Sequence, residues 1–247
     1  MTIDNIYILN QKISQSLKQL EYLKQSSYGK TQNISLKNLN FYNITNVQSL
    51  FLSQYIKYQC KLKLKYNTII NSKAQNINNA MNILEFGTSN GYSLLSMLKG
   101  VTQHHLSLKN LVQSSISDLN NHLILSFEID TFKFNEAIKN LKEYKDIFQI
   151  TLYNEDMFKA HNIIFKMNLK GFDIIFVDCN QEFYKEVFEY ILKYDLLSKS
   201  GSILFENTLS HVKSDFFFQS LDLNNQINSF EIIHYPLHNG FIELRRI

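Results

Sequence analysis

The chain of 247 residues has only two cysteines, Cys60 and Cys179, and neither belongs to a C-x-x-C pair or to a cluster of ligand residues. We expect two free buried thiols and no structural disulfide. The sequence also lacks an apolar run of the ~20 residues that cross a bilayer, and its first residues lack the apolar core of a signal peptide. These absences predict a cytoplasmic protein with no membrane partner.

Neither positive nor negative charge predominates in the sequence. The formal net charge is only +3 at pH 7, and the Lys and Arg residues are scattered among acids without a long basic run. Charge therefore does not indicate a nucleic-acid partner, although it leaves RNA open. The hydrophobic content of 45%, with 19 Phe and 14 Tyr, is sufficient for one folded domain with a full core.

The first 80 residues carry helical periodicity. Leu9, Ile13, Leu17 and Leu20 recur at helical spacing after Asp4, which predicts an amphipathic helix that ends between residues 26 and 29. Its apolar stripe would cover a sheet or a partner subunit, so a homodimer is one possible assembly. A second helix is predicted over residues 47–62, followed by a polar linker through residue 79.

From Met81 onward, short apolar segments alternate with helical patterns, which is typical of a parallel sheet covered by helices. A polar stretch at residues 103–121 is longer than a simple connection and predicts an insertion. Residues 230–236 and 241–244 flank an Asn-Gly pair and predict an antiparallel hairpin. The strands expected before it are 82–86, 123–129, 148–153, 172–178 and 202–205.

Residues 83–93 join an apolar strand to a helix through an acid and two glycines, with the spacing Glu-x-Gly-x-x-x-Gly. Glycine permits a positive φ and a close backbone approach, and the start of a helix presents unpaired N–H groups to an anion. Two interpretations follow: a cofactor loop, or an ordinary strand-to-helix turn that uses glycine for its geometry.

Acids and amides follow each of the five predicted strands. A single acid after a strand is usually a helix cap, but ligands of such sheets bind at the carboxyl ends of the strands, where these residues should meet. An acid at the tip of the second strand, Glu128, can accept the two hydroxyls of a ribose. The residues concerned are Glu85, Glu128 with Asp130, Asp156, Asp178, and Glu206 with Asn207.

Two further sites follow from these strand ends. Asp156 and Met157 suit an adenine amino group and ring face, with a plain helix N-cap as the alternative for Asp156. Asp178, Glu206 and Asn207 offer oxygen donors, which suit Mg²⁺ better than zinc. The histidines, among them His104 and His105, are scattered along the sequence, which indicates surface or structural roles.

Together these segments resemble the cation-dependent O-methyltransferases, the family of catechol and caffeoyl-coenzyme A methyltransferases, whose bacterial relatives include enzymes that modify hydroxyuridine in transfer RNA. The resemblance runs from about residue 43 to residue 247. It is carried by Asn43-Ile44 with residues 50–53, by the first motif at 84–93, by the ribose strand at 127–130, by two metal segments at 171–178 and 204–209, and by a closing strand at 240–246.

The resemblance implies an α/β fold: a Rossmann-like, doubly wound and mostly parallel sheet of seven strands with an antiparallel C-terminal hairpin strand. This class I methyltransferase domain would fill residues 46–247 behind a helical segment at 1–45. S-adenosylmethionine would be the methyl donor and a divalent cation, Mg²⁺, the second cofactor. The implied cofactor residues are Ile44, Glu85, Gly87, Ser89, Gly91, Ser93, Glu128, Asp156, Met157 and Asp178, and the implied metal ligands are Asp178, Glu206 and Asn207.

The chain departs from the family at two positions. Glu206 stands where the family has Asp, and Gln181 stands where the family has the lysine that takes the proton of the acceptor hydroxyl. Gln181 cannot act as a base, and Lys185, one helical turn further along, is an alternative. We expect methyl transfer to a metal-bound hydroxyl of a small, catechol-like acceptor, beside Asp178. The alternatives are a hydroxylated tRNA nucleoside as acceptor, or a cofactor-binding sensor or partner protein that has lost turnover.

Overall fold

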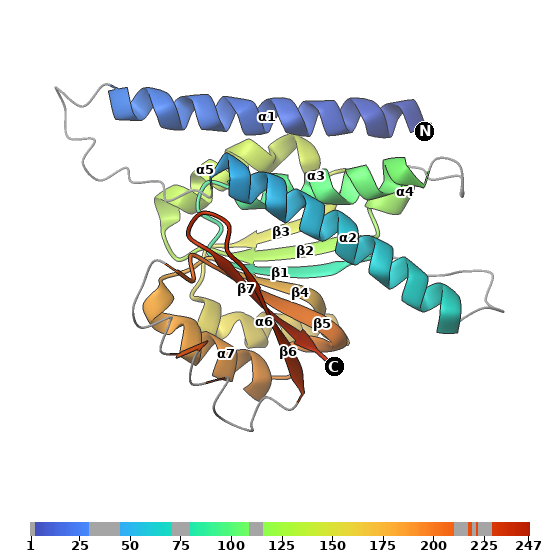
Figure 1. Cartoon of the computed structure of the whole chain (residues 1–247). Coiled ribbons are helices and arrows are strands. Elements are labelled where there is room, and N and C mark those ends of the chain that lie inside the picture. The colour runs from blue at the N-terminus through green and yellow to red at the C-terminus, as the bar shows by residue number, and fades with distance from the viewer. Residues whose placement is uncertain are drawn as a thin grey trace. The chain divides into compact units, whose positions relative to one another are not determined.

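The computed structural model describes residues 3–29, 45–70, 80–108, 116–209, 217–218, 221 and 229–247 (Figure 1). The chain divides into two compact units: a helical unit of residues 1–80, 89–122 and 132–149, and a sheet unit of residues 81–88, 123–131 and 150–247. No helix within the described ranges combines the length and the apolar character that a membrane span requires.

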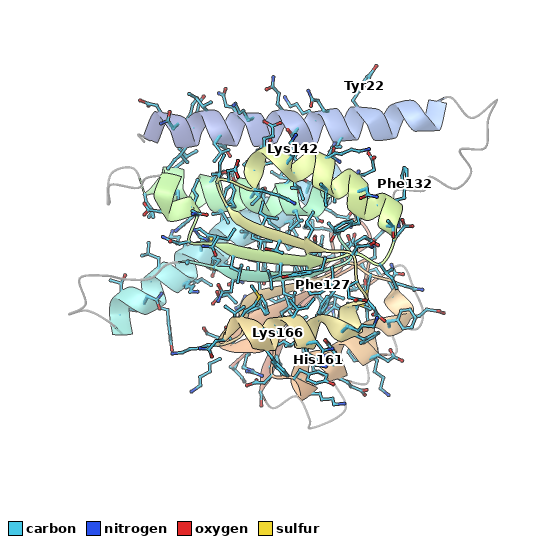
Figure 2. The ribbon with its side chains drawn as sticks, turned by 180° about the vertical axis from the view of Figure 1, so that it is seen from behind. Tyr22, Phe127, Phe132, Lys142, His161 and Lys166 are labelled. Atoms are coloured by element: carbon cyan, nitrogen blue, oxygen red, sulfur yellow. The ribbon has the colours of Figure 1, made fainter. Side chains whose placement is uncertain are left out.

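The helical unit contains two long helices near the start of the chain. The amphipathic pattern predicted for the first one is confirmed, because Leu9, Ile13, Leu17 and Leu20 are buried, whereas Tyr22 projects outward (Figure 2). The elements of this unit are α1 (Ile3–Gly29), α2 (Asn46–Ile70), α3 (Tyr92–Ser107), α4 (Ile116–Leu119), α5 (Thr131–Leu141) and the 3-10 turn η2 (Lys142–Tyr144). The first residue of α5, Thr131, is assigned to the sheet unit. The domain boundary predicted at residues 45 and 46 stays a prediction.

α2 and α3 pack closely against each other. A Cβ on Gly100 of α3 would lie 2.4 Å from the Ser53 carbonyl oxygen of α2, so only glycine allows this approach. α2 extends beyond its predicted end at residue 62 to Ile70. α3 takes up the first residues of the predicted insertion at 103–121 because His104 and His105 are buried on it, and residues 109–115 lie outside the described ranges.

The sheet unit is built on seven strands in the order β3-β2-β1-β4-β5-β7-β6. β1 pairs in parallel with β2 and β4, and β4 pairs in parallel with β5, whereas β7 is antiparallel to both β5 and β6. The predicted, mostly parallel sheet with an antiparallel C-terminal hairpin is thus confirmed. The strands are β1 (Asn82–Phe86), β2 (Leu123–Phe127), β3 (Gln149–Tyr153), β4 (Phe172–Val177), β5 (Leu197–Glu206), β6 (Phe230–Tyr235) and β7 (Phe241–Arg246).

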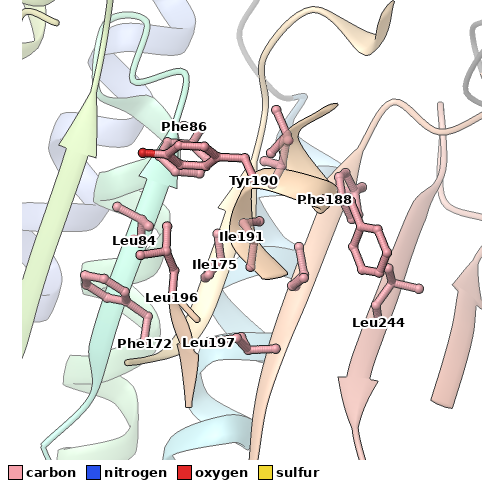
Figure 3. Packing of buried hydrophobic residues seen from close by; sticks show 14 of the residues in the cluster. Leu84, Phe86, Phe172, Ile175, Phe188, Tyr190, Ile191, Leu196, Leu197 and Leu244 are labelled. Atoms are coloured by element: carbon pink, nitrogen blue, oxygen red, sulfur yellow. The ribbon is translucent and has the colours of Figure 1, made fainter. Parts of the chain in front are cut away.

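A continuous apolar core joins the strands to two helices of the same unit. Tyr190 and Ile191 of α7 pack among Phe86 of β1 and Ile175 of β4 (Figure 3), and the rings of Phe86 and Tyr190 lie 6.3 Å apart. Burial of each such side chain contributes roughly 1.5–3 kcal/mol, so this core fixes the strand ends firmly. The helices are α6 (Ala160–Ile164) and α7 (Tyr184–Lys193), with the 3-10 turns η3 (Met157–Lys159), η4 (Phe165–Met167) and η5 (Gln181–Phe183).

Candidate active site

The carboxyl ends of β1, β2 and β4 lie side by side in the sheet unit. Phe86 is paired with Phe127 on one side and with Val177 on the other. Because these strands are parallel, the residues that follow them meet at one edge of the sheet. The structure therefore brings Glu85, Glu128 and Asp178 to the same end of the sheet, as the sequence predicted.

Gly87 lies directly against the backbone of Asp178, the residue that follows β4. Its φ is +100°, and a Cβ at this position would lie 2.1 Å from the carbonyl oxygen of Asp178. Its N–H donates to the Phe127 carbonyl at 3.0 Å, while the Asp178 N–H donates to the Phe86 carbonyl at 2.9 Å. No other residue fits here, so the first glycine of the motif is required by the contact between three strands.

Glu85 is completely buried at the end of β1 and is held by hydroxyl groups. Ser126, its partner in register on β2, donates a hydrogen bond to the Glu85 Oε2, and the Thr88 and Ser126 hydroxyls are hydrogen-bonded to each other. The sequence analysis missed both Ser126 and Thr88. A serine in the otherwise apolar strand LILSF was the available signal.

Glu128 is held by the backbone that follows it. Its Oε1 accepts a hydrogen bond from the Asp130 N–H at 2.9 Å. Asn154, at the end of β3, donates from Nδ2 to the carbonyls of Glu128 at 2.8 Å and Ile129 at 3.3 Å. These side-chain bonds end β2 at Phe127, two residues before the predicted end. Asn154 is a second residue that the sequence analysis missed.

Asp156 forms the N-cap of η3. Its Oδ1 accepts a hydrogen bond from the Phe158 N–H at 3.0 Å, and the neighbouring Met157 is half-buried. One carboxylate oxygen of Asp156 therefore serves as a helix cap, as the alternative interpretation of this residue predicted. Ile129 is 72% exposed at the adjacent strand end. The predicted contact of Asp156 and Met157 with an adenine stays a prediction.

Asp178 and Glu206 end neighbouring strands, because the residues before them, Val177 and Phe205, are paired. Tyr184 lies beside both acids, and its hydroxyl donates to the Glu206 backbone carbonyl. Burial, together with the charges of Asp178, Cys179 and Glu206, raises the pKa of Tyr184 well above its usual range. Burial and Asp178 also raise the pKa of the Cys179 thiol to about 12, so neither group is a nucleophile at neutral pH.

Asn207 follows β5 in a left-handed conformation with a φ of +56°. Its Oδ1 accepts a hydrogen bond from the Asn239 Nδ2 at 2.9 Å, and the Leu209 N–H donates to the Asn239 carbonyl at 2.7 Å. The predicted hairpin turn at Asn239 and Gly240 therefore contacts the segment that carries Asn207. Asn239 was not predicted as part of the site.

The predicted metal ligands fit a hard cation by their chemistry. Asp178, Glu206 and Asn207 supply two carboxylates and one amide oxygen, the ligand types that Mg²⁺ accepts. Within the described ranges, no group of three or more His, Cys, Asp or Glu side chains is arranged to hold a metal ion. The predicted set has two acids and one amide, so it does not form such a group, and metal binding by these three residues stays a prediction.

Gln181 is the first residue of η5, and Lys185 lies in the first turn of α7. Asn180 caps this turn by accepting a hydrogen bond from the Glu182 N–H at 3.1 Å. Lys185 is exposed, and its Nζ lies 3.9 Å from the Glu189 Oε1, one turn further along α7. A catalytic role for either residue stays a prediction.

The remaining predicted cofactor residues belong to the helical unit. Ser89 and Gly91 have φ values of +47° and +84°, and Ser93 is buried in the first turn of α3. Asn140 of α5 holds this segment by donating to the Asn90 carbonyl at 2.9 Å. Ile44 lies outside the described residues.

The helical unit also buries three histidines together. The Nε2 atoms of His105 and His122 are 2.9 Å apart, so one ring donates and the other accepts. Burial, the neighbouring His105, and Lys57 and Lys61 lower the pKa of His104 to about 4. The buried positions of His104 and His105 agree with the structural alternative of the predicted surface or structural roles, and the fold brings them together with His122 from the segment before β2. No sequence signal pointed to His122.

Comparison with solved structures gives the fold a context. The chain is similar to an O-methyltransferase from Bacillus cereus in complex with SAH, with a TM-score of 0.62, 16% identity, and coverage of 100% of both chains. It is also similar to the O-methyltransferase TomG from Streptomyces achromogenes in complex with SAM, with a TM-score of 0.57, 14% identity, and coverage of 96% of this chain and 88% of that one.

A third similar structure is a putative caffeoyl-CoA O-methyltransferase from Staphylococcus aureus, with a TM-score of 0.56, 18% identity, and coverage of 94% of this chain and 99% of that one. No family model and no curated protein matches the chain. The likeness confirms the predicted fold class, the class I methyltransferase fold.

Proposed function

We propose that this chain is an S-adenosylmethionine-dependent O-methyltransferase that acts on a small, hydroxylated, catechol-like acceptor. The observation that carries the proposal is the meeting of Glu85, Glu128 and Asp178 at one end of a sheet with this strand order. A fold can serve many activities, so the acids at this edge carry more weight than the fold alone.

Glu128 would bind the ribose of the cofactor. Its Oε1 is oriented by the Asp130 N–H. Asn154 fixes the backbone by donating to the carbonyls of Glu128 and of the next residue, Ile129. A carboxylate held in this way accepts two hydroxyl donors without having to order itself on binding. The exposed side chain of Ile129 would cover a face of the adenine, with Asp156 and Met157 on the next strand end.

Methyl transfer is an in-line displacement at a sulfonium carbon, so the protein must align the donor and acceptor and keep the acceptor oxygen nucleophilic. Asp178, Glu206 and Asn207 would hold a divalent cation, which when bound makes an acceptor hydroxyl more acidic. Lys185 would serve as base only if its side chain leaves Glu189.

The cofactor part of the proposal is tested by titration calorimetry with S-adenosylmethionine and with SAH. We expect both to bind the wild type, and Glu128→Ala to weaken both by about tenfold or more, since hydrogen bonds to a charged group are lost. Glu136→Ala is the matched control, because Glu136 is an acid outside the proposed site whose partner is the surface residue Lys139. A wild-type protein that binds neither compound would refute the proposal.

The acceptor part is tested with labelled S-adenosylmethionine, a panel of catechols and bulk transfer RNA, each with and without Mg²⁺. Label in a catechol that depends on Mg²⁺ is the expected result, and label in RNA alone would replace the small acceptor by a nucleoside. Loss of transfer in Lys185→Ala would assign the base. Full transfer would remove Lys185 from the mechanism.

One observation favours a second candidate. Gln181 stands where the family to which the chain is similar has its lysine, so a protein that binds the cofactor without turning it over is the alternative. Such a protein would bind SAH in the calorimeter and label no acceptor in the panel. Mg²⁺ binding would then separate an inactive enzyme, which retains the metal, from a sensor that has lost it.

A further inference from the structure

We infer that Ser126 and Thr88 are positioning residues that orient the Glu85 carboxylate toward the amino-acid part of the bound cofactor. This inference rests on the proposed function and adds to it two residues that the sequence did not reveal. All three side chains belong to the sheet unit and are at most 1% exposed, so their contacts are internal to one compact body.

The hydroxyl groups form a chain with one direction. Ser126 has a single hydroxyl hydrogen, which it donates to the Glu85 Oε2. Its hydrogen bond with Thr88 must then be donated by the Thr88 hydroxyl to the Ser126 oxygen. Thr88 therefore polarises Ser126, and Ser126 in turn presents its hydrogen to the carboxylate.

The backbone around this chain is fixed independently of the side chains. The N–H groups of Gly87 and Thr88 both point to the Phe127 carbonyl, at 3.0 and 3.4 Å, and Glu85 is paired in register with Ser126. The donor and acceptor are thus placed by the sheet ladder itself. The carboxylate plane is set before a ligand arrives, which reduces the ordering cost of binding.

The carboxylate position matters for one part of the cofactor only. S-adenosylmethionine and SAH both carry an α-ammonium group, which can donate a hydrogen bond to a carboxylate. 5′-Methylthioadenosine has the same nucleoside and no amino-acid part. A residue that orients Glu85 for the ammonium should therefore affect SAH and leave 5′-methylthioadenosine unaffected. A residue that only supports the sheet should affect both equally.

The test measures binding of SAH and 5′-methylthioadenosine by calorimetry in Ser126→Ala and Thr88→Val. We expect Ser126→Ala to weaken SAH by up to about tenfold, because the Glu85 carboxylate must then be ordered when the ligand binds. Thr88→Val should weaken SAH about threefold through the second bond of the chain, with recovery in Thr88→Ser. Affinity for 5′-methylthioadenosine should stay within about twofold throughout.

Ser202→Ala is the matched control. Ser202 is also a buried serine that donates to a buried glutamate, Glu243, at 2.7 Å, but in the middle of β5. We expect it to reduce thermal stability by an amount similar to Ser126→Ala and to leave SAH binding unchanged.

Equal loss of SAH and 5′-methylthioadenosine in Ser126→Ala, or unchanged SAH binding, would overturn the inference while the proposed function survives. A wild-type protein that binds neither compound would overturn the proposed function and the inference with it. The two failures are therefore distinguished by the wild-type titration alone.

Discussion

The two units bury polar side chains in contrasting ways. The sheet unit buries carboxylates and surrounds them with donors: Glu243 accepts hydrogen bonds from Ser202, Tyr235 and Arg245, and Glu85 accepts one from Ser126. The helical unit buries imidazoles whose pKa is lowered by burial itself. Donors on neighbouring strands hold the buried carboxylates in their charged form, whereas burial lowers the pKa of the imidazoles and favours their neutral form.

The largest effect on stability is expected from Gly87→Ala, which alters the sheet unit beside Glu85. The new Cβ would lie 2.1 Å from the Asp178 carbonyl oxygen at a φ of +100°, so the ends of β1 and β4 must separate. We expect a loss of at least about 3 kcal/mol in the free energy of unfolding, measured with urea. Gly91→Ala is the control.

The added Cβ in Gly91→Ala meets the flexible Leu141 Cδ1 at 3.0 Å, so a loss of about 1–2 kcal/mol is expected there from backbone strain. Equal losses in the two variants would contradict the claim that Gly87 is required by its contact with β4.

The next effect is the dependence of stability on pH through the buried histidines of the helical unit. The pKa of His122 is lowered to about 3, chiefly by burial and then by His105, His104 and Lys63, and that of His104 to about 4. An unfolded histidine binds its proton near pH 6.5, so the unfolded state gains protons first as the pH falls. Stability should thus be full above about pH 7 and fall toward pH 4, by roughly 2 kcal/mol per histidine at pH 5.

His105 belongs to the same cluster, and burial lowers its pKa while Asp118 of α4 raises it. Urea titrations at several pH values should show a shallower fall in a His104→Gln/His122→Asn double variant than in the wild type. The same pH slope in both proteins would show that other groups control the acid sensitivity.

Arg245→Ala tests whether the buried Glu243 depends on its charged donor. The guanidinium donates to both carboxylate oxygens, from Nε at 3.0 Å and Nη2 at 3.1 Å. Its removal leaves a buried carboxylate with neutral donors, which should cost about 2–4 kcal/mol. The double variant Glu243→Gln/Arg245→Met should recover much of this loss. A double variant as unstable as Arg245→Ala would contradict the claim that the loss comes from an unpaired buried charge.

The smallest effect separates a cap from a ligand contact. Asp156→Ala should lower stability by about 1 kcal/mol through loss of the N-cap of η3, and it should also weaken 5′-methylthioadenosine if the carboxylate meets the adenine. Asn180→Ala removes the equivalent cap of η5 and should lower stability alone. Unchanged nucleoside binding in Asp156→Ala would make Asp156 a cap only.

Sequence patterns predicted the strands and the meeting of their acids, because burial on both faces of a parallel sheet leaves near-continuous apolar segments with polar residues at the ends. They did not predict Ser126, Thr88, Asn154 or Asn239. Each of these acts through a partner on another strand or turn, and register between distant segments is set by the packed sheet. His122 was missed for the same reason.

The strand order has a consequence for synthesis of the chain. β7 lies between β5 and β6, although it follows both in the sequence. A nascent chain that has left the ribosome only as far as β6 therefore exposes the long edge of β5, which invites pairing with another chain. Residues 241–246 remove this exposed edge when they pair with β5 and β6.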